Sequence, residues 1–337
     1  MRCSLLLDLA GPISESVALA AAAEAAGIDA VHAIEGGRDA FVPLAAIAAG
    51  TSRIGLGSYV VNAYARSPWL TAMSALDLDE LSGGRFTLGI GTGNRYINDW
   101  THGLDSSRPL AKMREYVPIV RDVIAARAGD LVERHGDVHR TRWRAGRDPR
   151  RPTLPVVLAA AGPRMIELAG AVADGVGVGV LVSPEHLRDV IRPLAHDAAV
   201  AAGREAAELT FPMAAMVSVD HDEERARAST RHAICRLFHP VPHPYYDFLL
   251  RAQGFGAAAD AAAELVPAGR VREAMGHIDD EIVDRLTITG TPVTCAARLA
   301  AYDGLADEVI GLSLRRRDPD APLAVWDDVF EMFALAP

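Results

Sequence analysis

The stretch from Ile54 to Asn94 most narrowly constrains the fold, because it alternates between patterns typical of a strand, a helix and a second strand. Ile54–Val61 is an apolar run rich in β-formers, as a buried parallel strand requires. Ser67 and Pro68 then supply an N-cap and a first helical residue, and a pair of glycines ends the helix. A second apolar strand, Phe86–Ile90, follows. Two parallel strands joined by one helix form a βαβ unit, so the loops after both strands open on the same side.

The rest of the chain repeats this alternation. Strands are expected at Cys3–Leu9, Ala30–Glu35, Ile54–Val61, Phe86–Ile90, Pro155–Ala161, Val176–Val182, Leu209–Val219 and Glu308–Leu314. The helices expected between them include Ser14–Ala26, Pro43–Ala49 and Lys112–Arg127. Eight strands alternating with helices predict a (β/α)8 TIM barrel with insertions, formed by residues 1–337 as a single domain. A doubly wound sheet is the alternative, and it is disfavoured because no Gly-rich dinucleotide fingerprint follows the first strand.

Two segments interrupt this pattern. Residues from about 130 to 152 are charged and carry two glycine-containing turns, so we expect an excursion there, such as a hairpin. Three prolines between His239 and Pro244 break the next strand–helix unit. Residues from about 239 to 285 are therefore expected to form a helical insertion.

Charge and cysteine content exclude several classes of partner. The formal net charge of −10 gives no electrostatic attraction to nucleic acid or to anionic lipid, so neither is expected as a partner. The three cysteines are far apart and odd in number, which fits the reduced thiols of a cytoplasmic protein. The alanine-rich run Ala18–Ala26 is interrupted by Glu24 and is no membrane span, and the start of the chain resembles a strand more than a signal peptide.

Two kinds of chemistry have few or no candidate residues. No H-x-H pattern occurs on the first strand and no HExxH occurs anywhere, so no metal ligand set is expected. Lys112 is the only lysine, which leaves one candidate for Schiff-base chemistry, and it lies in an expected helix. His32 alternates with Ala30 and Ile34, and a buried structural histidine is the favoured interpretation.

In a barrel of this kind the chemistry lies at the carboxyl ends of the strands. The polar groups expected to face that mouth are Glu35, Asn62, Tyr64 and Arg66. Glu35 could donate a proton or a hydrogen bond to substrate. It could equally be a strand end paired with Arg66 or Arg38. Glu35, Asn62 and Tyr64 are the catalytic candidates.

A helix begins directly after the fifth expected strand, at Ala161, Gly162, Pro163 and Arg164. A helix start offers free backbone N–H groups and a positive dipole end, which suit a phosphate. Arg164 could add a charged donor. An ordinary helix start with a solvated arginine is the alternative.

The segment LDELSGGRFTLGIGTG resembles the signature of the luciferase-like oxidoreductases, whose members use flavin mononucleotide (FMN) or the deazaflavin F420. The preceding VVNAYARSP is similar to the VTNPYTRHP segment of the F420-dependent methylenetetrahydromethanopterin reductases. The resemblance extends over most of the chain. It is strongest from Gly37 to Asp122 and weak after Phe238.

The resemblance implies roles for several of these residues. Gly91, Thr92, Gly93 and Asn94 would lie against the polar edge of the ring or its ribityl chain, whereas alone they would only make a turn. The loop at Ala161–Arg164 would hold the cofactor phosphate. Tyr59-Val60 matches the position of a non-prolyl cis peptide that supports the ring, although the family often has Gly, Ser or Cys in place of Tyr59. Asn62 could bind the ring edge.

Other segments have weaker expectations. His239 and His243 could form the wall of a lid over substrate or a plain surface loop. Arg315–Arg317 is usually a solvated run, and could also meet an anionic substrate or the acidic tail of F420.

The resemblance implies an oxidoreductase that uses F420 for hydride transfer to or from a small organic substrate. The first alternative is an FMN-dependent luciferase-like monooxygenase that uses reduced flavin and O2. The alternative from another class is a non-catalytic flavin-binding protein, in which Tyr59, Tyr64 or the insertion would plug the pocket. Partners beyond the substrate could include a separate flavin or F420 reductase and a second copy of the chain.

Overall fold

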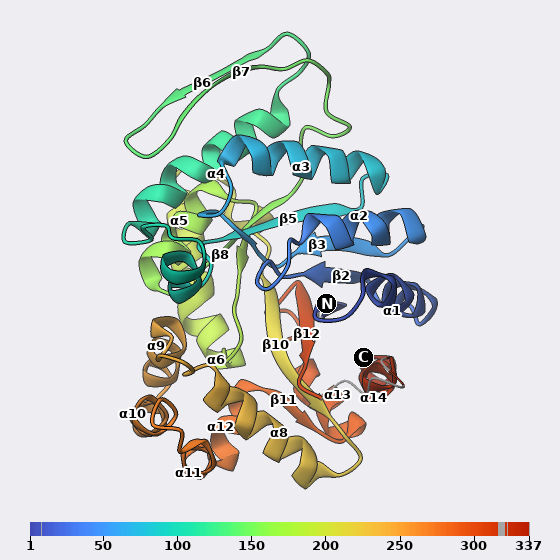
Figure 1. Cartoon of the computed structure of the whole chain (residues 1–337), viewed down its shortest axis with the longest axis vertical. Coiled ribbons are helices and arrows are strands. Elements are labelled where there is room, and N and C mark those ends of the chain that lie inside the picture. The colour runs from blue at the N-terminus through green and yellow to red at the C-terminus, as the bar shows by residue number, and fades with distance from the viewer. Residues whose placement is uncertain (8, 316–320, 322, 337) are drawn as a thin grey trace. The chain divides into compact units, whose positions relative to one another are not determined.

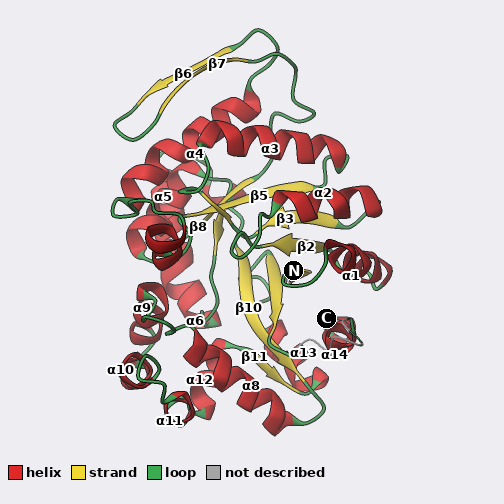
Figure 2. Ribbon diagram, in the orientation of Figure 1, coloured by secondary structure: helices red, strands yellow, loops and turns green. Residues whose placement is uncertain are grey.

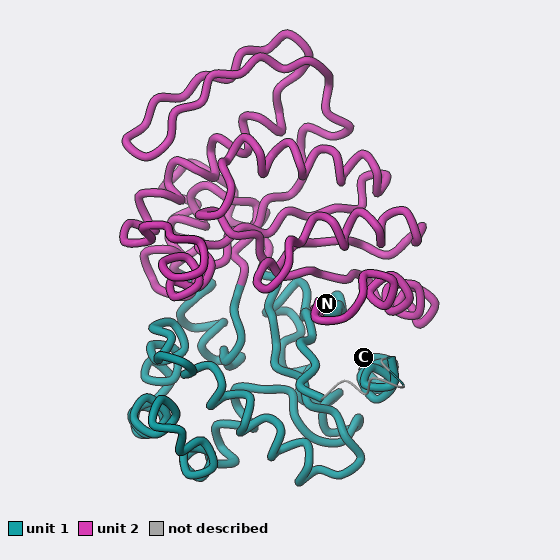
Figure 3. Tube along the Cα trace, viewed as in Figure 1, with its two compact units in different colours: residues 1–5, 178–193, 211–337 teal, residues 6–177, 194–210 magenta. Residues whose placement is uncertain are grey.

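The computed structural model describes residues 1–7, 9–315, 321 and 323–336. The chain divides into two compact units, shown in Figure 3. Unit 1 contains Met1–Leu5, Val178–Pro193 and Phe211–Pro337, and unit 2 contains Leu6–Gly177 and Leu194–Thr210. The single-domain organisation expected from the sequence stays a prediction.

Unit 2 contains parallel strands in the order β2-β3-β5-β8-β9, and β4 also pairs with β5. Their bounds are β2 (Ala30–Ala33), β3 (Gly55–Ser58), β4 (Val61–Asn62), β5 (Phe86–Gly91), β8 (Val156–Ala159) and β9 (Gly175–Gly177). Leu56 lies opposite Phe86 and Leu88 opposite Val156, and all four side chains are buried. The nearly unbroken apolar composition of these strands therefore matches burial on both faces.

Helices pack outside these strands, as Figures 1 and 2 show for α2 and α3 beside β3 and β5. The helices of unit 2 are α1 (Ile13–Ala25), α2 (Phe41–Gly50), α3 (Pro68–Leu81), α4 (Pro109–Ala125), α5 (Pro163–Val172), most of α7 (Arg192–Ala201), the π-helical turn η1 (Ile97–Thr101) and the 3-10 turn η3 (Ala206–Glu208). Helix α3 begins as predicted, because the Ser67 hydroxyl accepts the Leu70 N–H at 3.1 Å and Pro68 is the first helical residue.

Residues 130–152 carry an antiparallel hairpin of β6 (Leu131–His135) and β7 (Arg140–Arg144). Figure 1 shows this hairpin outside α3 and α4. Trp143 packs edge-on against Trp69 of α3, with ring centroids 6.5 Å apart. Alternate side chains of the hairpin thus cover the outer surface of the helix.

Unit 1 contains the parallel strand order β11-β10-β12-β1. Its strands are β10 (Pro212–Val219), β11 (Ile288–Gly290), β12 (Glu308–Ser313) and the first residues of β1 (Arg2–Leu7). Its helices are α6 (Pro184–His186), η2 (Leu187–Ile191), α8 (Glu223–Arg236), α9 (Pro244–Ala252), α10 (Gly256–Leu265), α11 (Val271–Met275), α12 (Asp280–Leu286), α13 (Pro292–Ala300), η4 (Ala324–Trp326) and α14 (Asp327–Leu335). Residues 239–285 thus carry α9 to α12. None of the helices in the described residues has the length and apolar character to cross a membrane.

Two predicted strands differ most from those observed, and one observed strand was not predicted. The strand predicted at Ile54–Val61 divides into β3 and β4, and the peptide bond between Tyr59 and Val60 is cis. The strand predicted at Val176–Val182 ends at Gly177, and in the described residues only a single bridge from Val178 to Met213 follows it. Leu181 has a φ of 64°, so no strand can run through to Val182. Strand β11 was not predicted, because three residues are too few to give a periodic pattern.

Candidate functional site

The carboxyl ends of β2, β4 and β5 meet in unit 2. Asn62 lies opposite Gly91 in the register of β4 and β5, and the Ala63 N–H donates to the Gly91 carbonyl at 2.9 Å. The Glu35 N–H donates to the Val60 carbonyl at 3.2 Å, and the Glu35 carboxylate accepts the Asn62 N–H at 2.7 Å. Predicted residues from three separate strands therefore lie together. Glu35, Asn62, Tyr64 and Gly91–Asn94 are called the carboxyl-end site below.

Glycines in and after β5 leave space that no other residue would leave. A Cβ atom at Gly89 would lie 2.1 Å from a backbone oxygen of β3, and one at Gly91 would lie 2.5 Å from Val60 Cγ2. Gly93 has a φ of +65°, and its Cβ would lie 2.8 Å from the Asn62 amide. Gly91 and Gly93 thus let the Val60 and Asn62 side chains lie directly against the turn, and Gly93 also supplies a left-handed conformation.

The turn after β5 offers a row of backbone donors. The N–H groups of Thr92, Gly93 and Asn94 have no acceptor within the described part of the chain. Asn98 holds the turn in place, because its Nδ2 donates to the Thr92 carbonyl at 2.8 Å and its Oδ1 accepts from Asn62 Nδ2 at 2.7 Å. Successive N–H groups in such a turn suit an electronegative ligand atom.

The Asn62 amide is partly committed to the protein. Besides its bond to Asn98, its Oδ1 accepts the Tyr64 N–H at 3.0 Å, and the residue is only 4% exposed. An amide has two N–H donors and two acceptor lone pairs, so one of each remains for a ligand. Asn62 therefore positions the loop that carries Tyr64 and keeps limited capacity to bind.

Glu35 lies in an environment that disfavours its charge. Burial raises the pKa of the Glu35 carboxyl group, although the Asn62 N–H and the Arg66 guanidinium both act in the opposite direction. Arg66 Nη1 lies 3.6 Å from Glu35 and 2.9 Å from Asp39, so its charge is shared between two carboxylates. Arg38 instead donates to the Gly11 carbonyl at 3.0 Å. Of the two arginine pairs considered, only the one with Arg66 forms.

Tyr64 lies two residues after Asn62, and its ring contacts Lys112, the only lysine of the chain. Lys112 Nζ lies 4.8 Å from the centroid of the Tyr64 ring and 5.8 Å from that of Tyr116, and burial lowers the pKa of the Lys112 ammonium. Helix α4 starts at Pro109 rather than at Lys112, since proline suits a first helical position. Lys112 therefore lies in the first turn of α4.

Tyr59 is buried beside the site. Its N–H donates to the Ala33 carbonyl at 2.8 Å, and its ring meets the edge of His32 with centroids 5.9 Å apart. His32 is buried, as expected, and a Cβ at Gly57 would lie 2.3 Å from His32 Nδ1. The glycine of β3 thus provides space for the histidine ring.

The loop at Ala161–Arg164 follows β8, the neighbour of β5. A Cβ at Gly91 would lie 3.5 Å from Ala159 Cβ, so the two strand ends are adjacent. The Gly162 carbonyl accepts the N–H groups of Met165 at 3.0 Å and of Ile166 at 3.1 Å, and no side chain caps the start of α5. Pro163 and Arg164 are exposed. Pro163 has no N–H, so the N–H groups of Gly162 and Arg164, which have no acceptor among the described residues, are the ones available to an anion.

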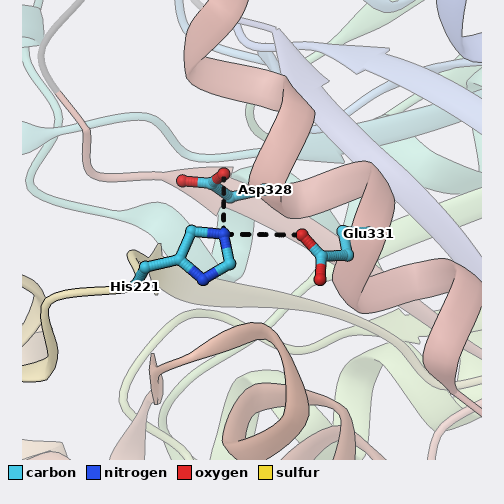
Figure 4. Close-up of side chains that lie close together, drawn as sticks. All are labelled: His221, Asp328 and Glu331. Carbon is cyan, nitrogen blue, oxygen red and sulfur yellow. Dashed lines mark ion pairs between the residues drawn. The ribbon is translucent and has the colours of Figure 1, made fainter.

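Other candidates lie in unit 1. His239, His243 and Arg315 belong to it, Arg315 pairs with Asp328, and Arg316 and Arg317 lie outside the described residues. His221 Nε2 lies 3.9 Å from Asp328 and 3.6 Å from Glu331, as Figure 4 shows. Arg315 also pairs with Asp328. We therefore interpret His221, Asp328 and Glu331 as part of a surface cluster of ion pairs.

Sequence reasoning missed two kinds of residue. Asn98 could have been found from the sequence, because it lies four residues, or about one helical turn, after the predicted site residue Asn94. Asp79 is 1% exposed and accepts from Arg151 Nε at 2.9 Å. It occupies the buried face of α3, seven residues after Ala72, so a buried acid was visible in the pattern. The first half of the LDELSGGRFTLGIGTG segment is thus structural, and the second half lies at the carboxyl-end site.

The parallel α/β fold and the glycine-lined turn at its carboxyl end agree with what the resemblance to the luciferase-like oxidoreductases implied. The chain belongs to the luciferase-like monooxygenase family, whose model matches residues 4–308. This confirms the family inferred from the sequence.

The comparisons also identify similar individual proteins. The chain is 31% identical over 299 residues to 5,10-methylenetetrahydromethanopterin reductase of Methanolobus tindarius, covering 86% of each chain. It is 31% identical over 309 residues to a coenzyme F420-dependent oxidoreductase of Mycobacterium tuberculosis, covering 86% of this chain and 88% of that one. The solved F420-dependent tetrahydromethanopterin reductase of Methanopyrus kandleri superposes with a TM-score of 0.80 at 23% identity, covering 97% of each chain. The match confirms the predicted fold class, an α/β fold of the luciferase-like (β/α)8 type.

Proposed function

We propose that this protein uses the deazaflavin F420 for hydride transfer to or from a small organic substrate. The observation that carries the proposal is the row of N–H donors at Thr92, Gly93 and Asn94, which have no acceptor in the described residues and follow a strand end lined by glycines. The two relatives at 31% identity, a methylenetetrahydromethanopterin reductase and an F420-dependent oxidoreductase, favour F420 over FMN.

The donor set fits such a cofactor. The polar edge of a deazaflavin ring carries oxygen and nitrogen acceptors, which match the three N–H groups and the remaining Asn62 N–H. The uncapped start of α5 at Gly162–Arg164 matches a phosphate. The cofactor supplies the hydride donor or acceptor, and the protein supplies orientation and exclusion of water. Tyr59 and Val60, next to Gly91, would support the ring.

Glu35 is the residue proposed to hold a proton for the substrate. Burial raises the pKa of its carboxyl group and so keeps a larger fraction protonated than in water. Asn62 holds the carboxylate at one oxygen and Arg66 lies near the other. Tyr64, fixed through the Asn62 amide, would orient the substrate beside Glu35.

The second candidate is a monooxygenase that uses reduced FMN and O2, which the description of the matching family favours. That enzyme would depend on a separate flavin reductase, and the F420 enzyme could depend on an F420 reductase. The exposed apolar side chains Val42 of α2 and Leu70 and Leu81 of α3 support a homodimer in either case, which sedimentation would test.

Anaerobic turnover tests the reaction. Purified protein with F420 is mixed with a panel of secondary alcohols and, separately, reduced F420 with ketones and imines, and the visible absorbance of the cofactor is followed. With at least one class of substrate, we expect the visible absorbance of the oxidised cofactor to decrease as it is reduced, or to increase as the reduced cofactor is oxidised. Glu35→Gln should slow that reaction at least tenfold without weakening F420 binding. Turnover only with FMN, reductase and O2 would contradict the proposal and favour the second candidate.

A further inference from the structure

Lys112 is unusual both in the sequence and in its surroundings. It is the only lysine in a chain of net charge −10. It lies in the first turn of α4, which follows the loop after β5, so the residue lies on the carboxyl-end side of that strand. Its Nζ faces the rings of Tyr64 and Tyr116.

The Lys112 ammonium has no neutralising partner. No carboxylate in the described part of the chain lies within ion-pairing distance of Nζ, although the side chain is half-buried. The nearest acid along the helix face, Glu115, is already used, because its carboxylate accepts the N–H groups of Asp137, Val138 and His139 at 2.9, 3.0 and 2.8 Å. A desolvated charge without a counter-ion is costly in the free protein.

A second polar group with an open hydrogen-bond position lies next to it. The His139 ring packs edge-on against Tyr116 with centroids 5.5 Å apart, and its buried Nε2 has no hydrogen-bond partner among the described residues. The Lys112 charge and burial both lower the pKa of the His139 imidazole. The Tyr116 hydroxyl shares a hydrogen bond with Thr71 at 2.6 Å and donates to the Ser67 carbonyl at 3.4 Å, and no hydrogen bond joins it to Lys112 in the described residues.

We propose that Lys112 is an anion-binding residue of the carboxyl-end site, and that its ammonium, held between Tyr64 and Tyr116, binds a carboxylate or phosphate of the ligand. In the free protein the aromatic faces partly compensate the ammonium for its lost hydration. In the complex the bound anion would neutralise its charge. The anion has two possible sources, the acidic side chain of the cofactor or an acidic substrate. The inference rests on the proposed location of the ligand site, not on the identity of the reaction.

Binding measurements separate the two sources. Kd values for F420 and for its deazariboflavin chromophore, which lacks the phosphate and the carboxylates, are measured by fluorescence for wild type, Lys112→Met and Lys112→Arg. Arg121→Met is the matched control, because Arg121 lies on the same helix, pairs with Asp174 and loses the same charge. If the cofactor is the source, Lys112→Met weakens binding of F420 at least tenfold and binding of the chromophore without side chain less than twofold. Lys112→Arg should restore most of the affinity.

Amine labelling tests the site independently of cofactor binding. Because Lys112 is the only lysine, trinitrobenzenesulfonate modifies only this side chain and the N-terminus, which peptide mass spectrometry distinguishes. Acetate, glutarate or inorganic phosphate should slow labelling of Lys112 at least fivefold, in wild type with or without cofactor. Protection by a carboxylate with unchanged F420 affinity in Lys112→Met would assign the anion to the substrate.

Failure of this inference and failure of the proposed function give different results. If wild type binds neither F420 nor FMN but phosphate or a carboxylate still protects Lys112, the anion site stands and the cofactor proposal fails. If F420 binds equally well to wild type and Lys112→Met, and no anion slows labelling, Lys112 is a structural residue and the inference is overturned. The labelling arm uses wild-type protein, so misfolding of a variant does not affect it.

Discussion

The two ends of the strands in unit 2 treat charged side chains differently. At the amino ends, hydrogen bonds and ion pairs stabilise the ionised forms of these side chains. At the carboxyl ends, burial disfavours the ionised forms, and the nearby partners do not compensate for it. Glu24 accepts the N–H groups of Arg53 at 2.6 Å and Ile54 at 2.7 Å just before β3, and these bonds lower the pKa of its carboxyl group to about 2. Burial instead raises the pKa of Glu35 and lowers the pKa of Lys112. One end of the sheet is thus satisfied by the protein itself, and the other has capacity left for a ligand.

Glycines at the two ends of the strands also differ in their surroundings. Gly83 has a φ of +72° and nothing within 4 Å of its Cβ position, so it only ends α3. Gly93 has a similar φ of +65° but lies against Asn62. The same backbone conformation is therefore used as a helix stop at one end and as part of a close-packed ligand turn at the other.

The largest effect is expected at the buried ion pair of the amino end. Asp79→Asn should lower the free energy of unfolding by about 3 kcal/mol, because Arg151 would lose a carboxylate partner that is 1% exposed. Asp77→Asn is the control on the same helix, since Asp77 is exposed and pairs with exposed Arg147. It should cost less than about 1 kcal/mol. Urea unfolding measures both, and equal losses would contradict the contrast.

The next effect compares the two glycines. Gly83→Ala should cost about 1 kcal/mol of stability, since it puts a Cβ on a left-handed residue, and Gly93→Ala should cost more, because its Cβ would also meet the buried Asn62 amide. Only Gly93→Ala should also weaken F420 binding, by at least tenfold, because its Cβ would displace the Asn62 amide. Thermal unfolding and fluorescence titration of both variants test this. Equal F420 affinities would show that the Gly93 turn does not contact the cofactor.

Glu24 should stabilise the protein in a pH-dependent manner. Its folded pKa lies at about 2, below the unfolded value, so its contribution is fully present above pH 4.5 and is lost as the pH falls toward 2. Glu24→Gln should lower stability by about 1 kcal/mol at pH 7, a figure kept small because the side chain is partly exposed. The difference between variant and wild type should vanish near pH 2. A pH-independent difference would contradict the assignment.

Glu35 should show the smallest effect, with the opposite sign. Its folded pKa is raised, so the folded state binds more protons and wild-type stability falls as the pH rises from the unfolded carboxyl pKa through the folded one. Glu35→Gln should remove this loss and leave stability at pH 7 equal or higher by less than about 1 kcal/mol. Unfolding curves of wild type and Glu35→Gln from pH 4 to 8 measure this difference in stability. A clear loss of stability in the variant at pH 7 would contradict the prediction.

The sequence predicted those features that depend on local pattern. Ile54–Val61, Pro68 and Phe86–Ile90 have the apolar periodicity, cap and strand composition that fix a βαβ unit. The glycines after β5 predicted a close approach, and Gly93 lies against Asn62. The family and fold class could be inferred because these short-range signals coincide in one stretch.

The remaining features depend on contacts between distant segments. The pairing of Asp79 with Arg151 spans 72 residues, and His139 reaches Tyr116 from the hairpin β6–β7. Neither partner has a local signal that names the other. The left-handed Leu181 was equally hidden, because the Gln253 side chain, which donates to its carbonyl at 2.8 Å, lies 72 residues away.

Parallel fluorescence titration of the purified wild-type protein with F420 and with FMN tests the central claim most directly. The claim is that the donors at Thr92–Asn94 and the start of α5 hold a deazaflavin cofactor. We predict saturable F420 binding at least tenfold tighter than FMN binding. Binding of neither cofactor would contradict the account, and would mean that Gly91–Asn94 and Gly162–Arg164 are structural turns.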